Sequence, residues 1–312
     1  GVLYATQAVE ATWRHAEGLG VVTHELCTVD GLDAAGGDGI AAALEVSATA
    51  SASSTAEGGG VARGRIEATK AVVLAPGAWI SDMSQRLLGL EIPTRVTAET
   101  VSYHAPIDAS PEASHKLSVA GKMPVFVADV DNDVGDMDLG YYGLPIVDVP
   151  GVKVSAHHAG AHLPDGPPMR PLSAGGEAHE NRAPVDDARE RAAAETTNAV
   201  LTSNKRFISR FWGGMLEEEP LKSQSCLYTA SPDHDYILGP VPGKPGIFLA
   251  GGGSGHAFKM GPAIGEALAC AALGEPLPYD MDQFAVSRAS LQQGLDGDDE
   301  ITISKWGGTR RK

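Results

Sequence analysis

A predicted strand, a glycine-rich turn and a predicted helix occupy residues 246–273, the segment whose residue types most clearly suggest ligand binding. The turn reads GGGSG at 251–255, and glycines let a backbone come close to a bound molecule. A helix that starts behind such a turn directs free N–H groups and its positive dipole end toward that molecule. The pattern predicts a site for an anion or an electron-rich heterocycle, although a tight turn in any α/β protein looks the same.

Two basic side chains, His256 and Lys259, follow this turn three residues apart, so a helical turn would place them on similar faces. Lys259 could hold a substrate carboxylate, and a solvated Lys at a helix start is the alternative. In residues 151–158 (GVKVSAHH), the even separation of Lys153 and His157 places both on one face of a predicted strand. Lys153 is then either a charge that protects an edge strand or a functional cation whose pKa the site perturbs.

Cys226 lies inside another predicted strand (SCLYTASPD), where most cysteines are simply small core residues. His157, His158 and His162 have an HHxxxH spacing, but adjacent strand residues point to opposite faces and no acidic ligand stands nearby. The acidic run at 131–138 lacks the ligand spacing of a calcium loop. We therefore predict no metal site.

The elements that must position these residues alternate between strand and helix patterns. The apolar run KAVVLA at 70–75 predicts a strand covered on both faces, followed by a PGAW turn and a helix over 81–88. An α/β or α+β fold follows, with a nucleotide-type domain split around a sheet domain. Further helices are predicted at 7–19 and 185–200, further strands at 21–29, 40–48, 64–68, 95–104, 123–130, 139–144, 151–157 and 223–229, and loops at 47–60 and 162–184.

Composition and charge exclude several classes of protein. The 312 residues carry a net charge of −16, which disfavours nucleic acid as a partner. Hydrophobic residues make up 43%, too many for a wholly disordered chain, and no apolar run is long enough to predict a membrane span. Cys27, Cys226 and Cys270 are far apart and indicate a reducing compartment. Without a visible signal peptide, the compartment stays open between cytoplasm and peroxisome.

Five motifs occur in a recognisable order: KAVVLAPGAW, YYGLP, GVKVSAHH, SCLYTASPDHDYILG and IFLAGGGSGHAFKMGPAIGE. Together they resemble the sarcosine oxidase-like branch of the D-amino-acid oxidase superfamily of FAD-dependent amine oxidoreductases. The resemblance covers about residues 1–290. It implies a split, Rossmann-like FAD-binding domain and a substrate domain with a mixed or antiparallel sheet. The implied division is a partial FAD-binding domain at 1–92, a substrate sheet domain at 93–220, the rest of the FAD-binding domain at 221–290 and a tail at 291–312.

The resemblance also implies roles for single residues. Cys226 would bond the 8α-methyl carbon of FAD, which overturns its interpretation as a core residue. Lys259 would pair with the substrate carboxylate beside His256, and Lys153 would lie over the flavin face where O2 is activated. The implied pocket-lining residues are Tyr142, His157 and Tyr228, and the implied cofactor contacts besides Cys226 and Lys259 are Gly77, Gly252, Gly253, Ser254 and Gly255.

The implied activity is oxidation of the C–N bond of an N-methyl or cyclic secondary amino acid to an imine, with O2 reduced to H2O2. The implied protein is a monomer whose partners are a small amino acid and O2, without nucleic acid or membrane. The family's opening strand with its G-x-G-x-x-G loop is absent, as are an acidic residue for the ribose and an early arginine. Because the sequence begins in mid-pattern, we expect a truncated N-terminus. An inactive fragment and a non-catalytic binding module are the alternatives.

Overall fold

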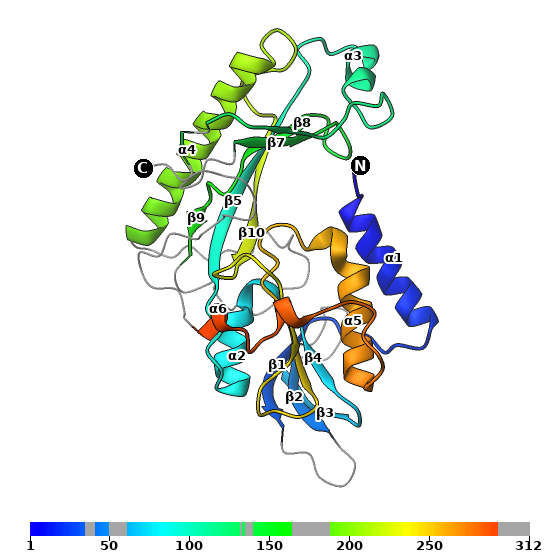
Figure 1. Ribbon diagram of the computed structural model, residues 1–312. Helices are drawn as coiled ribbons and strands as arrows, with labels where there is room; N and C mark the ends of the chain where they lie inside the picture. The colour runs from blue at the N-terminus through cyan, green and yellow to red at the C-terminus, as the bar shows by residue number, and fades with distance from the viewer. Residues whose placement is uncertain (35–40, 50–60, 132, 135–139, 164–187, 293–312) are drawn as a thin grey trace.

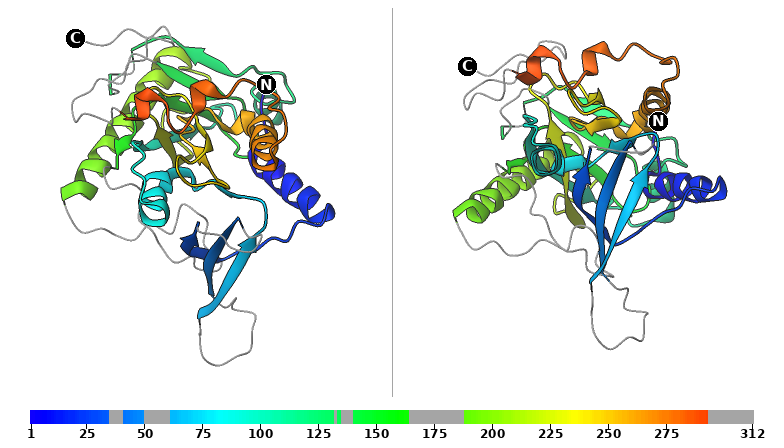
Figure 2. Two further views of the ribbon diagram at one scale, coloured as in Figure 1. Left: turned by 60° about the horizontal axis from the view of Figure 1, so that its bottom comes forward. Right: turned by 90° about the horizontal axis from the view of Figure 1, so that it is seen from below.

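The computed structural model describes residues 1–34, 41–49, 61–131, 133–134, 140–163 and 188–292 (Figure 1). These residues form a mixed α/β fold of three sheets with helices packed around them. In Figure 1 the largest sheet lies in the upper half, and the sheet of β1 (Cys27–Asp33), β2 (Ala42–Thr49) and β3 (Val61–Ala68) lies at the bottom. Figure 2 shows the same arrangement from two further directions. The described parts thus support the fold class that the sequence predicts.

The largest sheet is built around the ten-residue strand β5 (Arg95–His104), at the bounds expected from the sequence. Its pairings are all antiparallel, in agreement with the expected substrate sheet. The order is β10 (Lys222–Ala230), β5, β8 (Val152–Ala156), β7 (Tyr141–Leu144) and β6 (Phe126–Ala128), and β9 (Ala161–His162) also pairs with β5.

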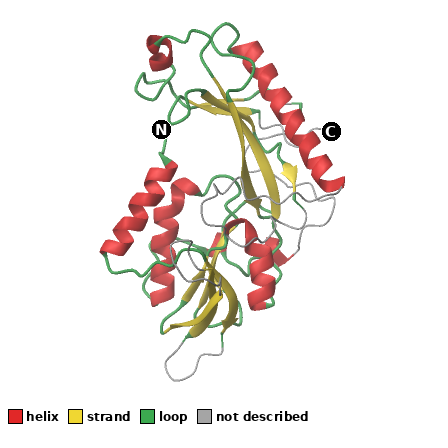
Figure 3. Cartoon of the chain, turned by 180° about the vertical axis from the view of Figure 1, so that it is seen from behind, coloured by secondary structure: helices red, strands yellow, loops and turns green. Residues whose placement is uncertain are grey.

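One face of this sheet is covered by the long helix α4 (Ala188–Phe211), which runs beside the long strands when seen from behind (Figure 3). Val154 and Tyr141 of the sheet form a buried core with Phe207 of the helix, and the Tyr141 and Phe207 rings stack 4.3 Å apart. Asn204 of α4 is fully buried and accepts a hydrogen bond from the backbone N–H of Ala156 at 2.9 Å. The helix therefore fixes which face of the sheet is core.

A second sheet carries the two strand–turn–helix segments that the sequence predicts. Its order is β11 (Ile237–Pro240), β12 (Ile247–Gly251) and β4 (Val72–Leu74), with β12 parallel to β4. After β4 come the 3-10 turn η1 (Gly77–Trp79) and helix α2 (Ile80–Leu88), and after β12 come η2 (Phe258–Met260) and α5 (Gly261–Leu273).

The prediction that the 70–75 strand is covered on both faces is wrong. Val72 and Leu74 are buried in the core, but Val73 between them is 42% exposed. Side chains alternate along a strand, so Val73 lies on the opposite face from Val72 and Leu74, and within the described residues that face is only partly covered.

The third sheet is an antiparallel meander of β1 (Cys27–Asp33), β2 (Ala42–Thr49) and β3 (Val61–Ala68). Val29 and Leu32 pack against the core of the second sheet. The strand expected at 21–29 begins only at Cys27, because β1 pairs with β2 from that residue onward. The side chains of Val21 and Val22 are exposed, so the hydrophobic pattern of this segment does not correspond to a buried strand face.

The other described helices are α1 (Ala5–Gly18), α3 (Pro111–Lys116), η3 (Asp282–Phe284) and α6 (Ala289–Gln292). The expected helix at 185–200 extends further than predicted, since α4 reaches Phe211. Most of the loops expected at 47–60 and 162–184 and of the acidic turn at 131–138 lies outside the described residues. The predicted domain boundaries at 92, 220 and 290 stay predictions. Among the described helices, none has the length and apolar character that a membrane crossing needs.

The C-terminal described segment is held to the turn after β10 by Arg288. Its guanidinium donates to both carboxylate oxygens of Asp233, at 2.7 and 2.8 Å, and to the carbonyl oxygen of Tyr236 at 2.9 Å. Burial raises the pKa of Asp233, but hydrogen bonds from Arg288 and Ser290 outweigh burial and hold that pKa below its usual range. The Arg288 side chain is only 9% exposed, so this ion pair is largely shielded from water.

Arg288→Met should lower the free energy of unfolding by about 3 kcal/mol, because it leaves a shielded carboxylate without its cation. Urea denaturation measures the change. Arg14→Met is the matched control, since Arg14 pairs with Glu10 at 3.9 Å on the exposed surface of α1 and should change stability little. Equal losses in the two variants would contradict the anchoring role.

Candidate active site

Four predicted site residues project from one face of the largest sheet: Cys226, Tyr228, Lys153 and Tyr142. Cys226 and Tyr228 are two positions apart on β10 and therefore share a face. Cys226 pairs with Glu99 of β5, and Tyr103, four residues further along β5, pairs with Lys153 of β8.

The pairing continues from β8 to β7, where Ser155 is opposite Tyr142. Directly opposed residues of an antiparallel pair lie on the same face, so the register brings together three segments that are far apart in the sequence. The other face is the one that α4 covers.

Lys153 is the cation of this face. Its Nζ lies 5.8 Å from the centroid of the Tyr142 ring, within the range of a cation–π contact. Burial lowers the pKa of Lys153, and the nearby Cys226 opposes that shift. The edge-strand interpretation of Lys153 is wrong, because β8 lies between β5 and β7 inside the sheet.

Tyr142 and Tyr228 form the aromatic part of the site. Burial raises the pKa of both phenols, and the two side chains are hydrogen-bonded to each other. Both therefore remain protonated around neutral pH and present a neutral, largely dry surface.

His157 and His158 join this surface from the turn after β8. The His157 ring meets the Tyr142 ring edge-on at 5.4 Å, and the His158 ring lies 5.2 Å from that of Tyr228. The expectation that the two histidines point to opposite faces is wrong: their rings are 4.4 Å apart. The strand ends at Ala156, and a left-handed φ of 52° at His158 turns both rings to one side.

The histidines are held neutral. Burial, followed by the neighbouring imidazoles, lowers the pKa of His157 to about 4 and that of His158 to about 3. His234 lies 5.5 Å from His158, and burial lowers its pKa as well. No functional role was predicted from the sequence for His158 or His234. The adjacent histidines at 157–158 and the PDHDY motif at 232–236 are the sequence features that could have indicated one. Within the described ranges, no group of three His, Cys, Asp or Glu side chains has a geometry that could hold a metal ion.

The glycine turn approaches the same face from the second sheet. Ser254 is buried, its backbone N–H donates to the carbonyl oxygen of Thr229 at 2.9 Å, and its hydroxyl donates to that of Gly252. Gly255 has a φ of 81°, and a Cβ there would lie 2.5 Å from the Tyr228 ring. The turn is thus docked on β10, while the cofactor contacts expected at Gly252, Gly253, Ser254 and Gly255 stay predictions.

His256 and Lys259 lie between the glycine turn and helix α5, and Lys259 is in the short 3-10 turn η2. The helix begins at Gly261, and the Lys259 side chain is exposed. His256 Nδ1 is 2.8 Å from the Tyr236 hydroxyl. Burial, and after it the charge of Lys259, lowers the pKa of His256. Lys259 is therefore an accessible cation at the rim of the site.

The turn η1 brings two more features to the site, because it packs against β10 and β12. Gly77 has a φ of 58°, and a Cβ there would meet no atom within 4 Å. Trp79 has its indole Nε1 buried without a hydrogen-bond partner among the described residues. A buried donor of this kind fits a ligand that carries a hydrogen-bond acceptor.

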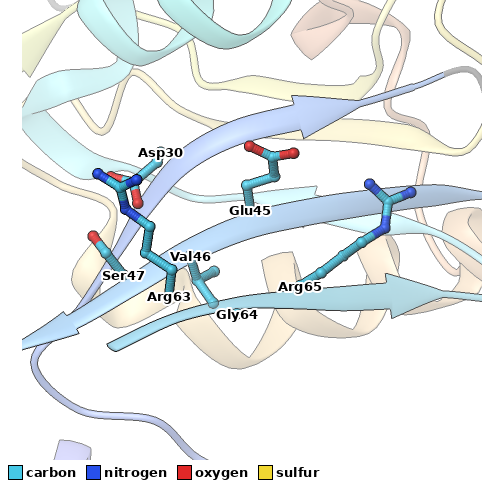
Figure 4. Close-up of a pocket in the computed structure, with 7 residues that line it drawn as sticks. All are labelled: Asp30, Glu45, Val46, Ser47, Arg63, Gly64 and Arg65. Atoms are coloured by element: carbon cyan, nitrogen blue, oxygen red, sulfur yellow. The ribbon is translucent and has the colours of Figure 1, made fainter. Parts of the chain in front are cut away.

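A separate hollow of about 590 Å³ lies on the β1–β2–β3 sheet (Figure 4). Arg63 and Arg65 of β3 and Glu45 of β2 project along it. It contains none of the predicted site residues; those that line it are Asp30, Glu45, Val46, Ser47, Arg63, Gly64 and Arg65. The site on the largest sheet remains the one that the predicted residues build.

Curated relatives include amine oxidases. A probable sarcosine oxidase from Arabidopsis thaliana is 29% identical over 226 residues, which cover 70% of this chain and 46% of the relative. An N-methyl-L-tryptophan oxidase from Yersinia pestis (strain Pestoides F) is 26% identical over 225 residues, covering 72% of this chain and 49% of the relative. The chain therefore spans about half the length of the curated relatives it matches.

Solved structures share the fold. L-proline dehydrogenase from P. horikoshii is 17% identical with a TM-score of 0.55, over 93% of this chain and 61% of that one. Glycine oxidase from Geobacillus kaustophilus is 16% identical with a TM-score of 0.52, over 88% of this chain and 55% of that one. The family model described as FAD dependent oxidoreductase matches residues 1–271, and the chain belongs to that family.

Proposed function

We propose that the protein oxidises the C–N bond of N-methyl or cyclic secondary amino acids, with FAD as cofactor and O2 as electron acceptor. The observation that carries the proposal is the shared face of β10, β8 and β7, where Cys226, Lys153 and Tyr142 come together by strand register. Membership of the FAD dependent oxidoreductase family and relatives named as sarcosine and N-methyl-L-tryptophan oxidases support it over a non-catalytic binding module. The monomeric state stays a prediction.

The residues present fit a flavin beside this face. Gly77 leaves open space where a side chain would stand, and Trp79 offers a buried indole N–H that has no hydrogen-bond partner in the described part of the chain. Cys226 is a free, half-buried thiol on the same face. When bound, the flavin supplies the two-electron oxidation of the substrate and passes the electrons to O2.

The two lysines of the site have different roles. Lys259 is exposed at its rim, next to His256, where it can bind the carboxylate of an amino acid. Lys153 lies within the sheet face beside Tyr142, where its ammonium would stabilise negative charge on oxygen as O2 is reduced. The lysines thus attract a carboxylate locally even though the chain's net charge is −16.

The neutral rings shape the rest of the pocket. Tyr142 and Tyr228 are protonated, and His157 and His158 have pKa values far below neutrality. Together they exclude water and add no positive charge that would oppose the amino group of the substrate.

Cys226→Ser should abolish covalent attachment of the flavin, because we assign the thioether bond to Cys226 Sγ. In acid-precipitated, flavin-loaded protein, the yellow colour should stay in the wild-type pellet and move to the supernatant in the variant. Cys270→Ser is the matched control, since Cys270 is a free cysteine of α5 and its loss should leave the colour in the pellet. Free flavin released from the wild type would refute the covalent bond.

Lys153→Met should slow reoxidation of the reduced flavin by O2 by about 100-fold or more, the effect of removing one electrostatic donor. Reduction of the flavin by substrate should change little, and stopped-flow absorbance follows the two half-reactions separately. Lys116→Met on the surface of α3 is the control and should affect neither. Equal slowing of both half-reactions by Lys153→Met would argue against a role in oxygen activation.

A further inference from the structure

Glu99 is a buried carboxyl group that the proposed chemistry does not use. It lies in the middle of β5, directly opposite Cys226 of β10, and is only 2% exposed. Burial raises its pKa, and hydrogen bonds from Thr97, Gly160 and Ala159 oppose that shift. A carboxyl group so deeply buried is destabilising unless its oxygens are bonded, so its partners indicate what it is for.

Both oxygens of Glu99 are engaged. Oε1 accepts from the hydroxyl of Thr97 at 2.6 Å. Oε2 accepts from two consecutive backbone N–H groups, those of Ala159 at 3.2 Å and Gly160 at 3.1 Å. Glu99 therefore holds the chain between β8 and β9 against β5.

This turn has no room to shift toward the strand. A Cβ on Gly160 would lie 2.6 Å from the carbonyl oxygen of Ala98 and 2.7 Å from Glu99 Oε1, so only glycine allows the close approach. On the far side of the turn, the backbone N–H of His157 donates to the carbonyl oxygen of Gly140 at 3.0 Å. The backbone of the turn is thus fixed at both ends.

The same turn carries the two imidazoles of the site. His157 meets Tyr142 and Tyr228 edge-on, and His158 contacts Tyr228 and His234. His158 has the left-handed φ of 52°, which is costly for a residue with a side chain. Favourable interactions must offset the cost of this conformation. The residues that follow His158, Ala159 and Gly160, make such interactions through their hydrogen bonds to Glu99.

We propose that Glu99 is a positioning residue of the active site, which acts through the N–H groups of Ala159 and Gly160 to hold His157 and His158 against Tyr142 and Tyr228. The expected effect of Glu99 on amine oxidation rests on the proposed function. The expected effect of Glu99 on the order of the 156–163 turn does not.

Amide hydrogen exchange of the full chain, measured by mass spectrometry on peptides that span residues 156–163, tests whether Glu99 orders the turn. In Glu99→Ala, protection of this turn should fall by about tenfold or more, because the two N–H groups lose their acceptor. Glu99→Gln should keep near wild-type protection, since the amide oxygen can accept from the turn while its NH2 donates to Thr97. Peptides from β12 report on the rest of the fold and should be unchanged.

Gly160→Ala gives an independent perturbation that leaves Glu99 intact. The added Cβ must push the turn away from Ala98 and Glu99, so it should reproduce the local loss of protection. Gly265→Ala in α5 is the matched control, because a Cβ there meets nothing within 4 Å. The double variant Glu99→Ala/Gly160→Ala should lose little more exchange protection than either single variant, as expected when both substitutions disrupt one shared interaction.

With a secondary amine as substrate, Glu99→Ala and Gly160→Ala should lower kcat/KM by about 10- to 100-fold, the cost of misplaced groups, and Glu99→Gln should restore it. Wild-type protection in Glu99→Ala, or a loss in Glu99→Gln as large as in Glu99→Ala, would overturn the inference. If the wild-type protein oxidises no amine, the proposed function fails, while the exchange measurement still decides the role of Glu99.

Discussion

The antiparallel pairing of β10 with β5 is the constraint on which the site depends. It runs without interruption from the Lys222–Tyr103 pair to the Ala230–Arg95 pair and joins segments more than a hundred residues apart in the chain. Because side chains alternate along a strand, a slip of one residue would turn Cys226 and Tyr228 to the face that α4 covers. On the opposite face of the same sheet, α4 is held by the contacts of Asn204 with Ala156 of β8 and of Phe207 with Tyr141 of β7.

Burial gives the resulting face its chemical character. Tyr142, Tyr228, His157 and His158 are all shifted toward their neutral forms, which leaves Lys153 as the cation among them. A cation in surroundings of low polarity acts more strongly on a developing negative charge than it would in water. The glycine turn and η1 contact this face from the second sheet, so the site lies where the largest sheet meets the second sheet.

The sequence was sufficient where a local pattern decides the outcome. The alternation at 95–104 predicts β5 at its observed bounds, and the even separation of Lys153 and His157 predicts that they share a face, where both lie against Tyr142. It was insufficient where non-local packing decides. Strand order, and with it the interior position of Lys153, depends on partners far along the chain. The joint orientation of His157 and His158 depends on where β8 ends, and the role of Glu99 depends on a turn that lies sixty residues away.

We propose that this face oxidises secondary amines with a bound flavin. Anaerobic titration of the FAD-loaded protein with N-methyl and cyclic secondary amino acids, followed by addition of O2, separates this proposal from a flavin that is bound but does not react with amines. We expect one of these amines to bleach the visible flavin absorption and O2 to restore it, with one H2O2 formed for each flavin reoxidised. Bound flavin whose absorption none of these amines changes would contradict it.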